Sequence, residues 1–275
     1  MATKIFTPSM LRGAGTRGVP EISVGSSYEN VYSMAFDGVD DYFDCGTLSS
    51  LVDNKSKLSI SLWVKFTNAG VTNRVAGKYV GLNKWLAIGG TSDTISFVVS
   101  GIGSSPNENL AYVQSNAVLS DNTWHHVVCV FDGTQGTLNN RGKIYIDGSD
   151  ESATYNRSFP SATYNFASEG SPPNWNLARN GYAPTSDELE GNMDEYSIYS
   201  GVALTPTMVG EIYNSGIPTN LNTLATAPTP DLWYRMGDKA TWDGTDFTLV
   251  DQGSGGNNAT SDNMDFADKV ADVPS

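Results

Sequence analysis

Residue types suited to catalysis are few in this chain. His125 and His126, the two histidines, stand side by side in an apolar run, so an extended backbone would direct them to opposite faces of one strand. From there they could not share a metal ion, and the sequence has no third imidazole or Cys-x-x-Cys pair to build a zinc site. Neither histidine accompanies a nucleophile elbow. We therefore expect both rings to pack and to form hydrogen bonds.

Carboxylates offer a second chemistry, that of glycoside hydrolysis. Acidic residues gather between Asp187 and Glu195. Glycosidases need two carboxylates about 5 to 9.5 Å apart, and a strand places acids on one face only at alternating positions. Glu188 and Glu190 alternate, but no second matched pair follows them. The sequence therefore predicts a protein that is not an enzyme.

The charge balance restricts the partners. The chain carries 30 acidic and 16 basic residues, for a net charge of −14. A surface of this sign repels phosphate backbones and anionic lipids, so we expect neither nucleic acid nor membrane as a partner. No apolar run of transmembrane length is present, and the first residues lack the apolar core of a secretory signal.

Two cysteines, Cys45 and Cys129, fall within predicted strands. Two cysteines do not form a disulfide framework, and buried free thiols are the simplest expectation. A single bridge between them stays open if the two strands are neighbours in an oxidising compartment.

Strands must position all of these side chains. Only 17% of the residues are charged and glycine is frequent, as in chains of many short strands joined by turns. Residues 58–66 alternate with period two, and residues 124–131 are apolar on both faces, which is typical of the centre of a covered sheet. Further strands are predicted at 85–88, 95–99, 111–113, 143–147 and 191–199, and a hairpin at 32–45. The pattern predicts an antiparallel sandwich of roughly a dozen strands.

One short helix interrupts the strands. Thr205 has the side chain of an N-cap, and Pro206 suits the first helical position. Val209 and Ile212 would share its buried side, and Gly216 follows its end.

Four segments carry a family resemblance. They read WHHVVCVFDG…GKIYIDG at 124–148, SMAFDGVDDYFDCG at 33–46, LSISLWVKF at 58–66 and LEGNMDEYSIYSGVALTPTMVGEIYNSG at 189–216. In this order they resemble the laminin-G-like, concanavalin-A-like jelly-roll domains. The resemblance implies an all-β fold, an antiparallel jelly-roll β-sandwich. Lectins, adhesins, enzyme accessory modules and virion proteins all use this sandwich, so it leaves the function open.

The resemblance also organises the chain. Residues 1–31, rich in glycine and with three basic residues, read as an extended N-terminal arm; residues 32–218 form the sandwich, and residues 219–275 a linker and C-terminal segment. Domains of this family usually open with an apolar-aromatic strand and an Asp-x-Ser-Gly turn. Here Leu232–Met236 and Asp251–Asn258 resemble that opening. Either residues 231–260 complete the sheet beside Ser33–Cys45, as in a circular permutation, or they are donated to a neighbouring subunit.

Two candidate sites follow. No cofactor is required, but the resemblance implies a structural calcium at Asp194, Asp251 and Asn257, for which ordinary turn hydrogen bonds are the alternative. For sugars, the irregular aromatic stretch between Asp150 and Asp187 is the expected binding region. Its candidate platforms, which would serve equally well as core or interface residues, are Tyr155, Tyr164, Trp175 and Tyr182.

The predicted function combines these readings. The segments WYRMGD at 233–238 and DQGSGGNNAT at 251–260 also resemble structural proteins of marine bacteriophages. We therefore expect a non-enzymatic virion protein at the virion surface, a decoration or adhesion subunit whose arm docks to the particle. Its partners would be other virion proteins, copies of itself and surface glycans. The alternative is a carbohydrate-binding lectin module of a bacterial cell-surface system.

Overall fold

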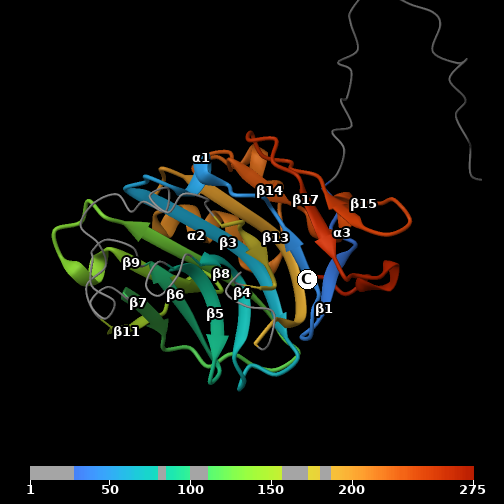
Figure 1. The fold of residues 1–275 in the computed structure, drawn as a ribbon. Helices are drawn as coiled ribbons and strands as arrows, with labels where there is room; N and C mark the ends of the chain where they lie inside the picture. Colours follow the sequence, from blue (N-terminus) through green and yellow to red (C-terminus); the bar gives the residue numbers. More distant parts are fainter. Residues whose placement is uncertain (1–27, 80–84, 100–110, 157–172, 180–186) are drawn as a thin grey trace, which may run out of the picture.

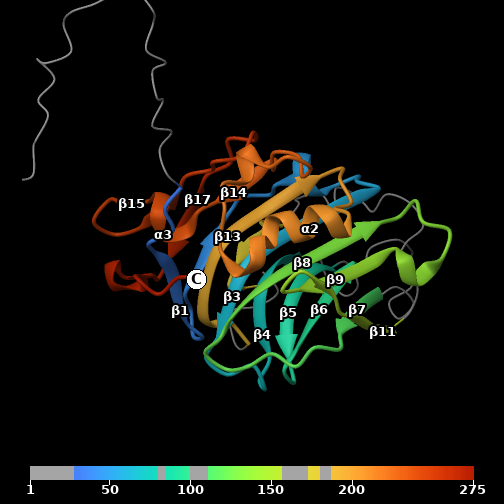
Figure 2. The same ribbon diagram turned by 180° about the vertical axis from the view of Figure 1, so that it is seen from behind.

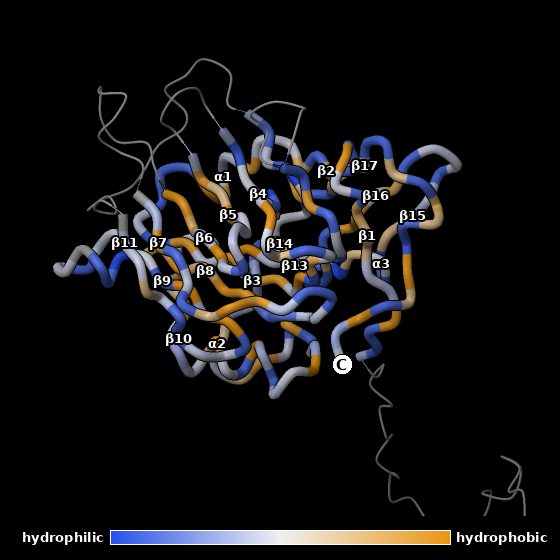
Figure 3. Tube along the Cα trace, turned by 90° about the horizontal axis from the view of Figure 1, so that it is seen from below, coloured by the Kyte–Doolittle hydropathy of each residue, from blue (hydrophilic) through white to orange (hydrophobic). Residues whose placement is uncertain are grey.

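Two antiparallel sheets stacked face to face make up the protein (Figure 1). The structure is a computed structural model that describes residues 28–79, 85–99, 111–156, 173–179 and 187–275. The expected all-β jelly-roll sandwich is confirmed, with its two layers visible edge-on in Figure 3. None of the described helices is long and apolar enough to cross a membrane.

Sheet A contains the two strands that the sequence marked most clearly. Its order is β10 (Ser149–Asp150), β9 (Gly142–Ile146), β8 (Trp124–Asp132), β3 (Lys57–Phe66), β13 (Glu190–Ser200), β1 (Ser33–Asp37) and β18 (Lys269–Val270), and β14 (Leu232–Tyr234) also pairs with β13. β8 pairs with β3 along its whole length, from Lys57 opposite Asp132 to Lys65 opposite Trp124.

Sheet B forms the other layer. Its order is β11 (Ser152–Asn156), β7 (Ala111–Ser115), β6 (Thr94–Val99), β5 (Trp85–Thr91), β4 (Asn73–Tyr79), β12 (Asn176–Leu177), β2 (Tyr42–Asp44), β17 (Ala259–Asp262), β16 (Phe247–Leu249) and β15 (Ala240–Trp242). The predicted hairpin at 32–45 is therefore wrong, because β1 belongs to sheet A and β2 to sheet B. The chain between them crosses from one layer to the other.

The main core fills the space between the layers. β8 contributes Val127, Cys129 and Phe131 to it, all fully buried, and sheet B faces them with side chains such as Ile88 and Phe97. Cys45 and Cys129 are both free. Cys129 lies in sheet A, whereas Cys45 follows β2 in sheet B, so their strands are not neighbours and the bridge does not form. Burial raises the pKa of both thiols.

A second, smaller core lies on the outer face of sheet A. Helix α2 (Pro206–Tyr213) crosses this face in Figure 2 and presents Val209 and Ile212 to Val128 and Val130 of β8. Its predicted cap is confirmed, since the Thr205 side chain accepts a hydrogen bond from the Met208 amide. The remaining helices are α1 (Ser49–Val52), α3 (Met236–Lys239) and the 3-10 turns Leu138–Asn140, Asn214–Gly216, Leu221–Thr223 and Phe266–Asp268.

The C-terminal segment pairs with strands of its own chain in both layers. β14 lies along β13, with Tyr234 opposite Tyr196, and β18 pairs with β1. β17 lies beside β2, with Thr260 opposite Asp44. The segment thus closes one end of the sandwich, where β18 lies beside β1 and β17 lies beside β2 (Figure 1).

Candidate ligand-binding groove

A groove lies on the outer face of sheet B. It has a volume of about 250 Å³ and runs over β4, β5 and β6. Ten residues line it: Thr72, Arg74, Trp85, Ala87, Ile88, Gly89, Gly90, Thr91, Ser96 and Val98. This mixture of one large aromatic ring, small apolar residues and a few polar groups is typical of sites for small polar ligands.

Strand alternation explains why these side chains meet. In β5, Leu86 and Ile88 point into the core, so Trp85, Ala87 and Gly89 point away from it. Ser96 of β6 lies opposite Gly89, and Gly89 lies opposite Arg74 of β4. Because Gly89 has no side chain and Ala87 only a methyl group, these two residues form a shallow floor of the groove next to the Trp85 ring.

Arg74 forms the charged wall of the groove. Its guanidinium Nη2 lies 3.4 Å from Oδ2 of Asp187, and its Cζ lies 5.9 Å from the centre of the Trp85 ring. Both members of the ion pair keep solvent access, 30% for the Arg74 side chain and 40% for that of Asp187. A cation and an anion therefore stand together at one edge of the groove, beside an indole ring.

Two of the four predicted sugar platforms, Trp175 and Tyr155, are described by the structure, and neither lines the groove. Trp175 is fully buried in the main core, next to β12, and so presents no ring face to the surface. Tyr155 packs half-buried against the same core, and its hydroxyl donates to the carbonyl of Gly142 at 3.2 Å. Tyr164 and Tyr182 lie outside the described residues. Sequence reasoning missed Trp85, although the alternation Trp85, Ala87, Gly89 opposite Leu86 and Ile88 was a signal for an open face.

The two histidines pack and form hydrogen bonds, as expected. His126 is buried against Trp63, and its Nε2 lies 2.9 Å from Ser61 Oγ. Burial lowers the pKa of this imidazole to about 4. His125 Nδ1 lies 2.8 Å from a carboxylate oxygen of Asp147. The alternating acids do not share a face either, because Glu188 is buried beside Arg179 while Glu190 is exposed.

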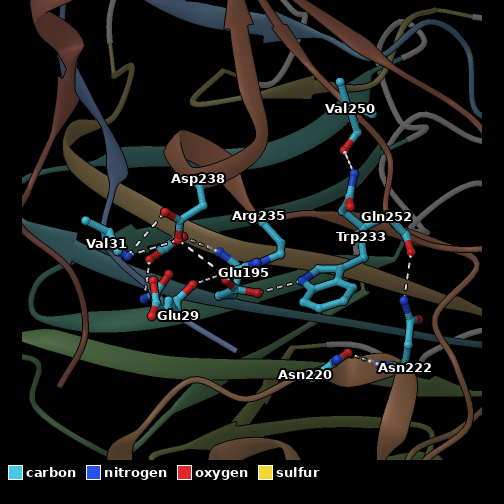
Figure 4. Close-up of polar contacts among 12 residues, drawn as sticks. Glu29, Val31, Glu195, Asn220, Asn222, Trp233, Arg235, Asp238, Val250 and Gln252 are labelled. Carbon is cyan, nitrogen blue, oxygen red and sulfur yellow. Dashed lines mark hydrogen bonds and ion pairs between the residues drawn. The ribbon is translucent and has the colours of Figure 1, made fainter. Parts of the chain in front are cut away.

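A buried acidic pair, Asp194 and Glu195, lies on β13 of sheet A, and Figure 4 shows the contacts of Glu195. Glu195 has a φ of 49° at an irregularity of β13, and its carboxylate turns toward the C-terminal segment. There it accepts a hydrogen bond from Trp233 Nε1 at 2.6 Å and one from Arg235 Nε at 3.3 Å. Asp238 provides Arg235 with a second carboxylate at 3.2 Å. These contacts stabilise the packing of β14 and α3 against β13.

Burial controls the protonation of this pair. Desolvation raises the pKa of Glu195 to about 7, and desolvation together with the Glu195 charge raises that of Asp194. Asp194 Oδ2 accepts a hydrogen bond from Asn30 Nδ2 at 2.9 Å, and its Oδ1 accepts one from the Glu195 amide.

The three predicted calcium ligands are already engaged with the protein. Both carboxylate oxygens of Asp194 accept hydrogen bonds from N–H groups. The carboxylate oxygens of Asp251 accept hydrogen bonds from the backbone amides of Trp233, Gly253 and Asn257 at 2.8 to 2.9 Å. The Asn257 carbonyl accepts the Tyr234 hydroxyl. A calcium ion would have to replace these bonds, so the residues do not fit the ion well. The site stays a prediction, and dialysis against EDTA tests it: we expect an unchanged melting temperature, whereas a drop that calcium reverses would establish the site.

A different acidic group comes together in the loop between β1 and β2. Asp37, Asp40 and Asp41 place carboxylate oxygens within 4.8 Å of one another. Asp41 Oδ2 accepts the Asp37 amide at 3.0 Å, and burial raises the pKa of Asp41 to about 7. These bonds shape the turn that carries the chain from one layer to the other.

Comparison with known proteins gives a family and a set of similar folds. Residues 37–210 match the family model described as the concanavalin A-like lectin/glucanases superfamily. No curated protein matches the chain. A solved structure of a Bacteroides ovatus protein, described as a candidate carbohydrate-binding protein, has a TM-score of 0.60 and 14% identity. The match covers 90% of this chain, which spans only 62% of that one.

A second similar structure is smaller than this chain. The CBM40 of the Ruminococcus gnavus IT-sialidase, bound to α2,3-sialyllactose, has a TM-score of 0.51 and 11% identity, with 67% of this chain and 96% of that chain covered. A further structure of this CBM40 has a TM-score of 0.50 and 10% identity, with 65% of this chain and 94% of that chain covered. At such identities these structures share the fold of this chain, and their ligands remain their own.

Proposed function

Because the chain belongs to the concanavalin A-like lectin/glucanase superfamily, we propose that it is a carbohydrate-binding protein whose site is the groove on the outer face of sheet B. The observation that carries the proposal is Trp85, which lies beside the Arg74–Asp187 pair above a floor of Ala87 and Gly89. The carbohydrate-binding proteins of similar fold support it.

The groove chemistry suits a sugar ring. One face of a pyranose is largely apolar C–H surface, and it can pack against the flat indole of Trp85 as other apolar groups pack on aromatic rings. The ring edge carries hydroxyls that both donate and accept. Arg74 supplies donors, Asp187 supplies acceptors, and the Thr91 and Ser96 hydroxyls supply both.

Glycan-array binding with a matched variant tests the proposal. Wild-type protein should bind a defined set of glycans, and Trp85→Ala should lower that affinity at least tenfold, because such an aromatic anchor contributes about 2 kcal/mol. Phe266→Ala is the control, since Phe266 is an aromatic residue 64% exposed on the C-terminal segment, remote in the fold from β5. The proposal fails if wild-type protein binds no glycan, or if Trp85→Ala binds as wild type does.

We propose that this binding occurs without catalysis. The ten lining residues include no histidine, cysteine or acid, and the adjacent Asp187 is paired with Arg74. Incubating the glycans that bind with excess protein should leave them intact by mass spectrometry; shortened products would contradict a binding-only role.

A role on a virion surface remains a second proposal, in which the same groove would serve adhesion. The resemblance of residues 233–238 and 251–260 to marine phage structural proteins supports it. Mass spectrometry of purified phage particles should then detect this chain at stoichiometric abundance. Its absence from particles would favour the lectin module of a bacterial cell surface.

A further inference from the structure

We propose that the groove continues past β6 onto β7, and that its ligand is an oligosaccharide held by two aromatic side chains, Trp85 and Tyr112. This inference rests on the proposed carbohydrate binding. It adds a specific second contact, Tyr112, and a direction for the ligand across the strands.

Strand register places Tyr112 on the same face as the groove. Val98 and Ala87 both line the groove, and they lie opposite each other in β6 and β5. Tyr112 of β7 lies opposite Val98 in turn. Residues directly opposite in an antiparallel sheet point to the same side, so Tyr112 extends the row that Ala87 and Val98 begin.

Burial along β7 agrees with this direction. Val113 is fully buried and belongs to the main core, whereas Tyr112 and Gln114 keep partial solvent access. Tyr112 therefore turns away from the core, as Trp85 does in β5. A partly exposed phenol ring on this face is a second surface on which a sugar can pack.

The spacing between the two rings selects the size of the ligand. Ala87 of β5 and Tyr112 of β7 lie in one row across the sheet, with Val98 of β6 between them. Trp85 lies two residues before Ala87 on β5, so it is displaced from Tyr112 by two strands and by two residues along the strand direction. With strands about 4.8 Å apart and a rise of about 3.4 Å per residue, the two backbone positions are about 12 Å apart. One pyranose ring is too short to contact both side chains, so a chain of sugars must bridge them.

Polar groups occupy the next row on the same face, beyond Tyr112 on the side away from Trp85. Ser96 of β6 lies between Gly89 and Gln114 on the same face. The Gln114 amide donates to Thr94 Oγ1 at 2.7 Å, which holds its side chain toward β6. A sugar over the row of Ala87, Val98 and Tyr112 would therefore meet hydroxyl and amide groups at one edge, while the Trp85 and Tyr112 rings pack against different sugars of the chain.

The test is a length series. Homologous oligosaccharides of one to six units from cellulose, xylan, mannan and chitin are placed on the array, and each series that binds is titrated by calorimetry. Affinity should rise at least tenfold from the single sugar to the longer members. Tyr112→Ala should remove that gain and leave the affinity for the single sugar unchanged, whereas Tyr112→Phe, which keeps the ring, should retain it.

Two results would overturn the inference while leaving the proposed function intact: an affinity that does not depend on length, or long oligosaccharides that bind Tyr112→Ala as tightly as wild type. Failure of the proposed function looks different, because Trp85→Ala would then have no effect on any member of the series. The melting temperature of Tyr112→Ala should match that of wild type, which separates loss of binding from loss of folding.

Discussion

The outer faces of the two sheets have similar sequence patterns, but the face on sheet A is covered and the face on sheet B carries the groove. On sheet A, the outer side of β3 carries Ser59, Ser61 and Trp63, and all three are buried. On sheet B, the outer side of β5 carries Trp85, Ala87 and Gly89, and it lines an open groove. A strand pattern thus assigns side chains to a face, while the rest of the chain decides whether that face is covered.

The cover on sheet A depends on small side chains and on the C-terminal segment. Ser59 Oγ donates to the Val202 carbonyl and accepts from the Leu204 amide, both at 3.0 Å, so the chain leading to α2 lies directly on β3. Trp233 completes the same apolar cluster from β14. Helix α2 does not cover sheet B, and the Trp85 side chain on β5 keeps partial solvent access.

Deletion of the C-terminal segment should have the largest effect. Removing residues 228–275 deletes β14 to β18, which takes one strand partner from each of β13, β1 and β2 and exposes the part of the outer face of sheet A that Trp233 covers. We expect the truncated protein to be insoluble, measured as the soluble fraction after expression. A full-length Phe266→Ser variant, altered at an exposed side chain of the same segment, should stay soluble. A folded, monomeric truncation would contradict this account of the closed face.

Loss of the Glu195 carboxylate should cost less but remain severe. Glu195→Ala leaves the Trp233 indole N–H buried without its acceptor and removes one of the two carboxylates at Arg235. Breaking a buried pair of this kind costs about 3 to 5 kcal/mol of unfolding free energy, measurable by urea denaturation. Glu195→Gln, which keeps an acceptor for the indole, should lose less. Equal losses in the two variants would show that the hydrogen bond to Trp233 contributes little.

Glu195 should also make the free energy of unfolding depend measurably on pH. The pKa of Glu195 is raised to about 7 in the folded protein, so the folded state binds more protons than the unfolded state between about pH 4.5 and 7. Its contribution is complete below pH 4.5 and is lost as the pH rises through 7. Asp41 and Asp194 act in the same direction, whereas His126, whose pKa is lowered to about 4, acts oppositely.

Melting curves of wild type and Glu195→Gln across this range isolate the Glu195 contribution. The melting temperature of wild type minus that of Glu195→Gln should decrease as the pH rises from 4.5 to 7. A difference that stays constant would mean that Glu195 is already ionised at pH 4.5 in the folded protein.

Local pattern made much of the fold predictable. The alternation in residues 58–66, the doubly apolar run at 124–131 and the cap at Thr205 each depend on neighbours in sequence, and all three formed as expected. Partners far apart in sequence were harder to assign. The pairing of β14 with β13 and the placement of β1 and β2 in different layers depend on contacts that no local pattern encodes.

The binding site was less predictable than the fold. Trp175 lies in an irregular, aromatic stretch that resembled a binding loop, yet a tryptophan fills a core as readily as it forms a platform. Trp85 stands in a short strand where period two assigns two faces without telling which is covered. Among the described residues, the packing of α2 and Trp233 on sheet A distinguishes the two outer faces.

The most direct test of the groove is a titration of isotopically labelled protein, followed by NMR, with the tightest-binding glycan of the array. The account predicts that the largest shift changes fall on the Trp85 indole and on the amides of Gly89, Ser96 and Val98. Shift changes confined to the outer face of sheet A or to the C-terminal segment, with these groove signals unmoved, would contradict it.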